Sequence, residues 1–325
     1  MSPCVVYLVR AANGMEPFAA FIQSYRTHPA GVPHELALVF KGFRSEDETR
    51  PHLDLAGGLV SDVLHVGDEG FDLTAYFAAA GRLGRECYCF LNSFSEILAD
   101  GWLGSLRAAL GDPDVGLVGA SGSWASIRSY ARFNLGLGGP YARVFPSRAA
   151  TRALMAQHTA RSSARNGSAP GKLATLREVL HQLVFFEPFP CHHVRTNAFM
   201  LTGEACSRIR IGTLREKVDA YRFESGRASI TRQVERIGLR AVLVGRDGRP
   251  HEVPEWPASR TFWQGGQENL LVADNQSREY ERGDADLRRL LSRYAWGELG
   301  QAGLSRHSPQ PCDVGIDHQL DEFPE

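Results

Sequence analysis

The stretch Phe90–Ser123, FLNSFSEILADGWLGSLRAALGDPDVGLVGASGS, holds the end of a strand, a helix and a further strand. The apolar run Cys87–Leu91 is dense in large side chains, which predicts a strand that is buried on both faces. Gly101–Leu110 has leucines at helical spacing, and Val115–Val118 is again short and apolar. Strand, helix and strand in this order are typical of a βαβ unit in a parallel sheet.

The same alternation continues on both sides of this stretch. We expect strands at Val5–Val9, Leu36–Phe40, Val60–Val66 and Val194–Leu201, helices at Pro17–Tyr25, Leu73–Ala80, Leu173–Leu183 and Ser229–Ile237, and a hairpin of Ala241–Val244 and His251–Val253 around Asp247–Gly248. The pattern predicts an α/β fold with a mostly parallel central sheet flanked by helices. In such sheets, ligands bind beyond the carboxyl ends of the strands.

Composition narrows the class of protein. The chain has 325 residues, of which 43% are apolar and 22% charged, as in a soluble globular protein. The formal net charge of −1 argues against a dedicated nucleic-acid binder. No apolar run approaches the roughly 18 residues of a membrane span, and no basic residue precedes the first apolar run as in a secretory signal. The six cysteines form no CxxC pair, so we expect reduced thiols in a cytoplasmic protein.

Charge is unevenly distributed along the chain. Val115–Arg177 contains no Asp or Glu, but it carries many Arg and Lys residues. Within it, Thr159–Lys172 has the composition of a mobile loop. This segment is either a solvated basic loop or a local field that attracts a polyanion, such as a pyrophosphate or an anionic lipid headgroup. The polar tail from Ser305 onward is expected to be disordered.

The order and spacing of Phe90–Ala120 resemble the central part of the family 2 glycosyltransferases, which have the GT-A fold. In that family, a strand ends in an acidic DxD-like cluster that holds the diphosphate of a nucleotide sugar, usually through a divalent cation. The resemblance extends over Val5–Val244. It implies that Asn92, Ser93, Ser95 and Glu96 lie at the diphosphate.

This chain departs from the family at the cluster itself. Phe94 stands where relatives carry an aspartate, and Glu96 is the one nearby carboxylate. Manganese or magnesium prefers several oxygen ligands, so Glu96 would make only a weak metal site. The sequence therefore establishes no cofactor. The basic segment is an alternative source of countercharge for the leaving group, since arginine suits phosphate.

Two residues at other strand ends complete the implied donor side. Val66–Tyr76 resembles a turn in polysaccharide-building relatives whose aspartate lies near the nucleobase, which makes Asp72 a candidate for hydrogen bonding to a base edge. The same residue type is also common at a helix N-cap, and both interpretations stay open. Arg10 ends the first strand, where family members touch the nucleotide, and is otherwise a surface cation.

The acceptor side is implied by two later segments. Arg195–Leu201 resembles the strand before the acceptor site, which places Arg195 and Asn197 there. Lys217–Gly226 stands where relatives carry an "ED" pair, one member of which is the general base of inverting enzymes. Glu224 takes the first position of that pair and is our first choice of base. Asp219 is the reserve, or else a helix cap or surface ion pair.

The sequence gives weaker support for two other possible sites. His192 and His193 could bind a metal, but adjacent residues on a strand point to opposite faces, so we expect one packed and one exposed histidine. Trp256 and Trp263 suit a sugar face if exposed, with burial in the core as the default.

The sequence thus predicts a GT-A glycosyltransferase that transfers a sugar from a nucleotide-diphosphate sugar to a hydroxyl of a glycan, lipid carrier or small molecule. Inversion follows if Glu224 is the base, and retention stays open as the alternative. We divide the chain into a nucleotide-sugar-binding half (1–120), an acceptor-side half of the same domain (121–255), a C-terminal helical and aromatic extension (256–304) and a tail (305–325). The alternatives are an inactive nucleotide-sugar-binding protein and a nucleotidyltransferase, although the latter would need a Gly-rich basic loop after the first strand. No nucleic-acid partner is expected, and peripheral membrane contact is allowed but not indicated.

Overall fold

The computed structural model describes residues 2–162, 180–214 and 216–299. The predicted tail (305–325), most of the predicted mobile loop and the first part of the helix predicted at Leu173–Leu183 lie outside the described residues. Within the described part, no helix combines the length and apolar character needed to cross a membrane.

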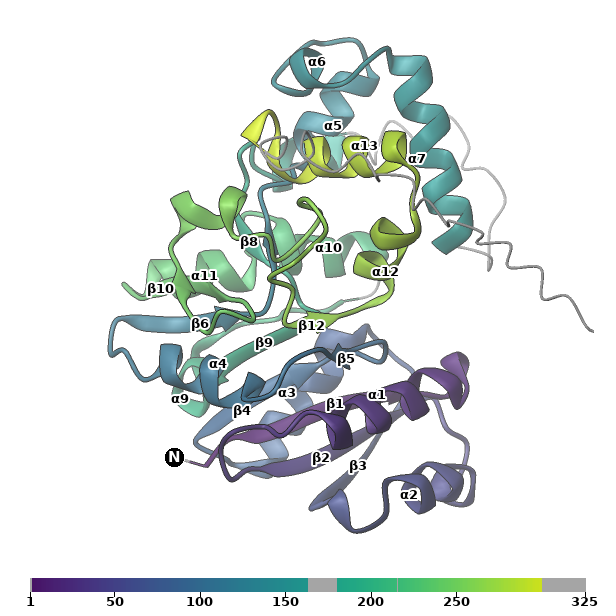
Figure 1. Cartoon of the computed structure of the whole chain (residues 1–325), viewed down its shortest axis with the longest axis vertical. Helices are drawn as coiled ribbons and strands as arrows, with labels where there is room; N and C mark the ends of the chain where they lie inside the picture. The colour runs from purple at the N-terminus through teal and green to yellow at the C-terminus, as the bar shows by residue number, and fades with distance from the viewer. Residues whose placement is uncertain (1, 163–179, 215, 300–325) are drawn as a thin grey trace, which may run out of the picture.

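A central sheet of eight strands organises the chain (Figure 1). Its order is β11 (Pro250–His251), β10 (Arg240–Val244), β6 (Val115–Gly119), β9 (Ala198–Thr202), β4 (Cys87–Leu91), β1 (Cys4–Arg10), β2 (Glu35–Lys41) and β3 (Asp62–Val66). The strands β4, β1, β2 and β3 run parallel, as do β6 and β10, whereas β9 is antiparallel to both of its neighbours. The predicted α/β class with a mostly parallel central sheet is confirmed.

Both faces of this sheet are covered, because alternate residues of each strand point to opposite sides. Cys87 and Cys89 of β4 pack in one apolar cluster with Phe21 of α1 (Glu16–Thr27) and Trp102 of α4 (Trp102–Leu110). On the other face, the neighbouring residues of β4 pack against α3 (Asp72–Leu83) and α9 (Gly203–Arg208). The prediction that this strand is buried on both faces is confirmed.

The remaining elements agree with the predicted order. The other helices are α2 (Arg50–Ala56), α5 (Ile127–Asn134), α6 (Tyr141–Val144), α7 (Arg148–Ser162), α10 (Lys217–Ser225), α11 (Ile230–Arg236), α12 (Asn275–Arg282) and α13 (Ala285–Trp296). The predicted helix Ser229–Ile237 is α11 with Ser229 as its N-cap. The predicted hairpin joins β10 to β11.

One predicted element is wrong. Val194–Leu201 is not a single strand: β8 (His193–Val194) pairs with β7 (Gly122–Ser123) in a separate small sheet, and the central sheet resumes only at β9. The break falls at Arg195–Asn197. The polar groups there bond to Ser121, Glu224 and the end of β4 instead of to a regular neighbouring strand.

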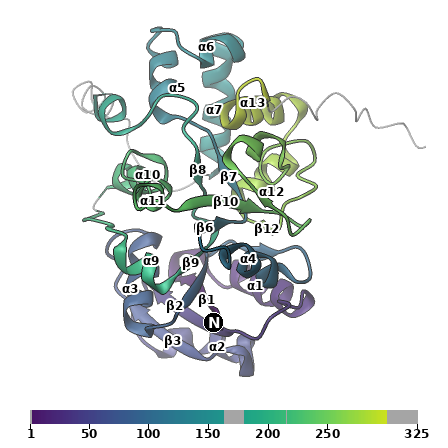
Figure 2. The same ribbon diagram turned by 90° about the vertical axis from the view of Figure 1, so that its left-hand side faces the viewer.

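The C-terminal segment folds back onto the rest of the chain. The short strand β12 (Val272–Ala273) pairs with β5 (Glu96–Ile97), which directly follows the turn after β4. Phe133, Tyr141 and Phe145 of the α5–α6 region pack against Leu290 of α13. Figures 1 and 2 both show α5, α6 and α7 at the end of the molecule opposite α2. Trp256 and Trp263 are buried, as the default interpretation predicted.

Candidate functional site

Arg10 and Asp72 meet at the carboxyl edge of the sheet. Arg10 is the last residue of β1, and its Nη1 lies 3.7 Å from Oδ1 of Asp72. Asp72 is the first residue of α3, whose N-cap is Phe71, so the N-cap interpretation of Asp72 is wrong. Burial raises the pKa of Asp72, while the positive charges of Arg10 and Lys41 act in the opposite direction.

A cavity of about 380 Å³ opens beside this pair. Its charged lining residues are Arg10, Lys41, Arg44, Glu48 and Asp68. Lys41, the last residue of β2, is almost completely buried, and its Nζ donates to the carbonyl oxygens of Gly67 (3.3 Å) and Glu69 (2.8 Å). Sequence reasoning missed Lys41, because only the fold shows that this lysine is buried and holds the loop that carries Asp68.

Hydrogen bonds among its own residues stabilise the turn after β4. Oδ1 of Asn92 accepts hydrogen bonds from the Phe94 amide and the Ser95 hydroxyl, both at 3.0 Å. The carbonyl of Ser93 accepts from the Tyr7 hydroxyl (3.0 Å), and its Oγ accepts from Asn13 (2.7 Å). Ser95 is fully buried. The side chains of Asn92, Ser93 and Ser95 therefore shape the turn and tie it to the end of β1.

Glu96 is engaged in an ion pair. Its Oε2 lies 2.9 Å from Nη2 of Arg278 on α12, and Arg278 also contacts Glu281 at 3.0 Å. Phe94, on the turn itself, is 37% exposed and offers no metal ligand. Among the described residues, no group of three or more His, Cys, Asp or Glu side chains could hold a metal ion. The residues at this turn do not fit the divalent cation that the family resemblance implies.

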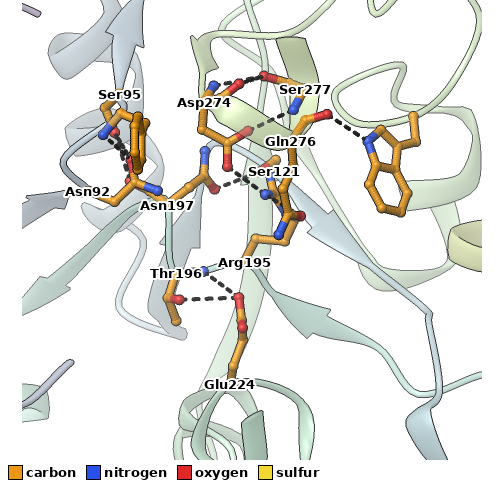
Figure 3. Close-up of polar contacts among 12 residues, drawn as sticks. Asn92, Ser95, Ser121, Arg195, Thr196, Asn197, Glu224, Asp274, Gln276 and Ser277 are labelled. Atoms are coloured by element: carbon orange, nitrogen blue, oxygen red, sulfur yellow. Dashed lines mark hydrogen bonds and ion pairs between the residues drawn. The ribbon is translucent and has the colours of Figure 1, made fainter. Parts of the chain in front are cut away.

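Arg195 is buried, and Figure 3 shows its polar contacts. Its Nη2 forms an ion pair with Asp274 (2.6 Å) and a hydrogen bond with Gln276 (2.9 Å), and Nη1 donates to the Ser121 hydroxyl (3.1 Å). The guanidinium also lies over the ring of Phe262, 3.8 Å from its centre. Asp274 in turn caps α12. Arg195 thus joins the C-terminal segment to Ser121, which follows β6.

Asn197 links this region to the turn after β4. Its carbonyl accepts from the Asn92 amide (2.8 Å) and the Ser95 hydroxyl (3.0 Å), and its Oδ1 accepts from Ser121 (2.8 Å). Its Nδ2 is buried without a hydrogen-bond partner among the described residues. Such a group is costly unless something pairs with it.

Glu224 projects from α10 toward the same segment, as Figure 3 shows. Its Oε1 accepts hydrogen bonds from the amide (3.3 Å) and the hydroxyl (3.1 Å) of Thr196. Both bonds fall on one oxygen, so Oε2 has no partner in the part of the chain that the structure describes. Glu224 also lines a cavity of about 650 Å³, together with Arg195, Tyr221 and Trp263.

Asp219 lies elsewhere on α10. Its Oδ2 accepts from the Glu216 amide (3.0 Å) at the start of the helix, and its Oδ1 is 3.6 Å from Arg222. Asp219 is not among the residues that line the 650 Å³ cavity. Asp219 therefore acts as the helix cap and ion-pair partner considered from the sequence. The structure does not bring Asp219 together with Glu224 at the cavity.

His193, considered from the sequence only as a possible metal ligand or a packed residue, is buried beside Glu224. His193 of β8 and Arg195, directly after this strand, both line the 650 Å³ cavity. Nδ1 of His193 lies 2.8 Å from the carbonyl oxygen of Cys191, which can only accept, so Nδ1 carries the proton. Nε2 has no hydrogen-bond partner among the described residues. Burial lowers the pKa of His193, which favours the neutral ring, although Glu224 opposes this effect.

The adjacent His192 has a different environment. Its Nε2 lies 2.6 Å from Glu235 and 2.9 Å from Arg232, away from the cavity. The two histidines therefore do not share a metal. The sequence alone does not indicate which of these two adjacent histidines lines the cavity.

Comparison with known proteins yields only partial likenesses. No family model and no curated protein matches the chain. A crystal structure of GalNAc-T7 with UDP, GalNAc and Mn²⁺ is similar over 36% of this chain and 22% of that chain, with 18% identity and a TM-score of 0.30. A cytidylyltransferase from Leptospira borgpetersenii is similar over 36% of this chain and 53% of that one, with 10% identity and a TM-score of 0.29. This chain thus matches about a fifth and about half of the lengths of those two proteins.

Proposed function

We propose that this protein is a glycosyltransferase of the GT-A type, which moves a sugar from a nucleotide-diphosphate sugar to a hydroxyl group of an acceptor with inversion. The observation that carries the proposal is the position of Glu224. Glu224 lines a 650 Å³ cavity, and Thr196 donates both of its hydrogen bonds to one carboxylate oxygen, which leaves the other available. The next residue along the chain, Asn197, contacts the turn after β4.

The donor occupies the carboxyl edge of the sheet in this proposal. The nucleotide lies in the 380 Å³ cavity, where Arg10 and Lys41 supply positive charge. Asp72, which contacts Arg10 beside this cavity, is the candidate for hydrogen bonding to a base edge. The diphosphate lies next to the turn after β4. Asn92, Ser93 and Ser95 maintain the shape of this turn. Because the turn does not fit a divalent cation, no step of the reaction is assigned to one.

The acceptor occupies the 650 Å³ cavity. Its hydroxyl proton passes to Oε2 of Glu224 while the hydroxyl oxygen forms a bond to the anomeric carbon. The bond from that carbon to the diphosphate oxygen breaks, and the electron pair leaves with the diphosphate. Attack from the side opposite the leaving group inverts the anomeric centre. Arg195 and Asn197 support the wall of the acceptor cavity, the former through its contacts with Asp274 and Ser121.

A panel of nucleoside diphosphates and nucleotide sugars, each with manganese and with chelator, tests the proposal by thermal shift. A ligand at a hundred times its dissociation constant stabilises the fold by about 2.7 kcal/mol. Sugar transfer or donor hydrolysis by the wild-type protein supports catalysis. Binding of a nucleotide sugar with no turnover would favour the inactive binding protein, and no binding at all would overturn the assignment.

A further inference from the structure

Arginines and leucines gather on α5, α6, α7 and the loops that join them, at the end of the molecule opposite α2. The loop between α5 and α6 presents Leu135 and Leu137, which are 47% and 53% exposed. Arg132 donates to the carbonyl oxygen of Leu137 (3.3 Å), and Arg152 donates to that of Asn134 (2.5 Å). We call Arg132, Leu135, Leu137, Arg143, Arg148 and Arg152 the arginine–leucine tip.

Three guanidinium groups of the tip, those of Arg132, Arg148 and Arg152, contact the end of α5 or the loop between α5 and α6. Arg148 packs so closely on Gly136 that a methyl group added there would collide with its Nη1. Arg143 and Arg148 are exposed. No arginine of the tip forms an ion pair with a carboxylate of the described residues. Like charges held together without counter-ions create a local positive potential that attracts an anionic surface.

The tip is also rigidly placed. The buried rings of Phe133, Tyr141 and Phe145 anchor α5 and α6 on α13 through Leu290. Figures 1 and 2 show α6 at the outer end of the molecule. The loop therefore projects its leucines outward from a packed base.

We propose that the arginine–leucine tip docks this protein on a membrane that contains anionic phospholipids. The arginines contact the headgroups, and Leu135 and Leu137 enter the boundary between headgroups and acyl chains. The exposed leucines favour a lipid surface over a nucleic acid, because phosphate contacts need charge but not apolar side chains. This proposal does not depend on the proposed glycosyltransferase activity.

Co-sedimentation of the full chain with vesicles tests the proposal, using phosphatidylcholine alone or phosphatidylcholine mixed with phosphatidylglycerol. We expect binding to the mixed vesicles only, weakened at high salt because exposed charges are screened. The variant Arg143→Gln/Arg148→Gln should lose about 30-fold in binding, since each cation near the surface contributes about 1 kcal/mol. Leu135→Ser/Leu137→Ser should also lose binding with its charge intact.

A matched control removes two positive charges elsewhere. Arg50 and Arg282 are exposed and lie outside the tip, so Arg50→Gln/Arg282→Gln should bind the mixed vesicles like the wild type. Equal losses in both arginine double variants, or no binding by the wild type, would overturn the proposal. So would wild-type binding by Leu135→Ser/Leu137→Ser together with tight binding of a single-stranded RNA, which would point to a nucleic-acid partner. Thermal unfolding of each variant verifies that it is folded.

Discussion

Thr196 donates both its amide and its hydroxyl to a single carboxylate oxygen of Glu224. This arrangement fixes the orientation of the partly buried Glu224 side chain. It also leaves the second oxygen of this cavity-lining residue without a partner among the described residues. The pair thus supplies what a general base needs, namely a defined position and an available lone pair.

Replacement of Glu224 tests this role most directly. Glu224→Gln keeps an oxygen that can accept from Thr196 but removes the basic carboxylate. We expect sugar transfer to fall by about 10²- to 10⁴-fold, the usual contribution of a general base, with unchanged donor affinity. Steady-state kinetics and nucleotide titration measure the two quantities.

Asp219→Asn is the matched comparison on the same helix. Because Asp219 caps the start of α10 and does not line the cavity, we expect a loss of stability of up to about 1 kcal/mol and nearly normal transfer. If Asp219→Asn abolished transfer and Glu224→Gln did not, the two carboxylates would have to exchange roles.

Substitutions at His193 separate its two ring nitrogens. Asn places a nitrogen near Nδ1, so His193→Asn keeps the bond to Cys191 and loses the cavity-facing acceptor at Nε2. His193→Gln places a polar atom near Nε2 instead. If Nε2 accepts from the sugar acceptor, His193→Asn should raise the KM for the acceptor by about tenfold and His193→Gln by less. Equal values for both variants would assign His193 a purely structural role.

His193 also predicts a pH dependence of stability. Burial lowers its pKa in the folded protein below the value of about 6.5 in the unfolded chain. As the pH falls below about 6.5, the unfolded chain therefore binds the proton first, and stability is lost. Glu224, Arg195 and His192 act on the same ring. Thermal unfolding between about pH 8 and pH 5.5 should show a smaller decline for His193→Asn than for the wild type.

The turn after β4 predicts independence from divalent cations. Glu96 is paired with Arg278, and the residues around it do not form a ligand set. Donor binding and transfer should therefore be the same with chelator as with manganese or magnesium. Activity that vanished with chelator and returned with manganese would contradict this prediction.

The buried ion pair of Arg195 and Asp274 predicts a stability pattern. Arg195→Met leaves Asp274 as an unpaired buried charge, which costs about 3–5 kcal/mol. The double variant Arg195→Met/Asp274→Asn removes both charges and retains a residue that can cap α12, so it should be more stable than Arg195→Met alone. Chemical denaturation of the three proteins gives the comparison.

The architecture was largely predictable because its signals are local. The apolar density of Cys87–Leu91 and the spacing of leucines in Gly101–Leu110 report burial and helical period directly. The break of the strand at Arg195–Asn197 was not predictable, because its cause is a set of partners far away in the sequence, such as Asp274.

The candidate site was predictable only where it coincides with strand ends. Arg10 and the turn from Asn92 follow from the topology of a parallel sheet. Lys41 and His193 carry no local signal, since burial and the identity of the hydrogen-bond partner depend on the tertiary structure. Arg278 and Glu96 are 182 residues apart in the sequence, and no sequence pattern predicts their contact.

The Glu96–Arg278 contact and the pairing of β5 with β12 join two segments that are far apart in the sequence. During synthesis, the structure around the turn after β4 therefore forms later than the turn itself is made. The turn after β4 leaves the ribosome long before Val272–Arg282, the part of the chain that pairs with it. A nascent chain that ends before β12 therefore contains the strands β1, β4 and β9 of the central sheet but lacks the partner of β5. The region that we propose to bind the donor is therefore complete only after Val272–Arg282 has been synthesised.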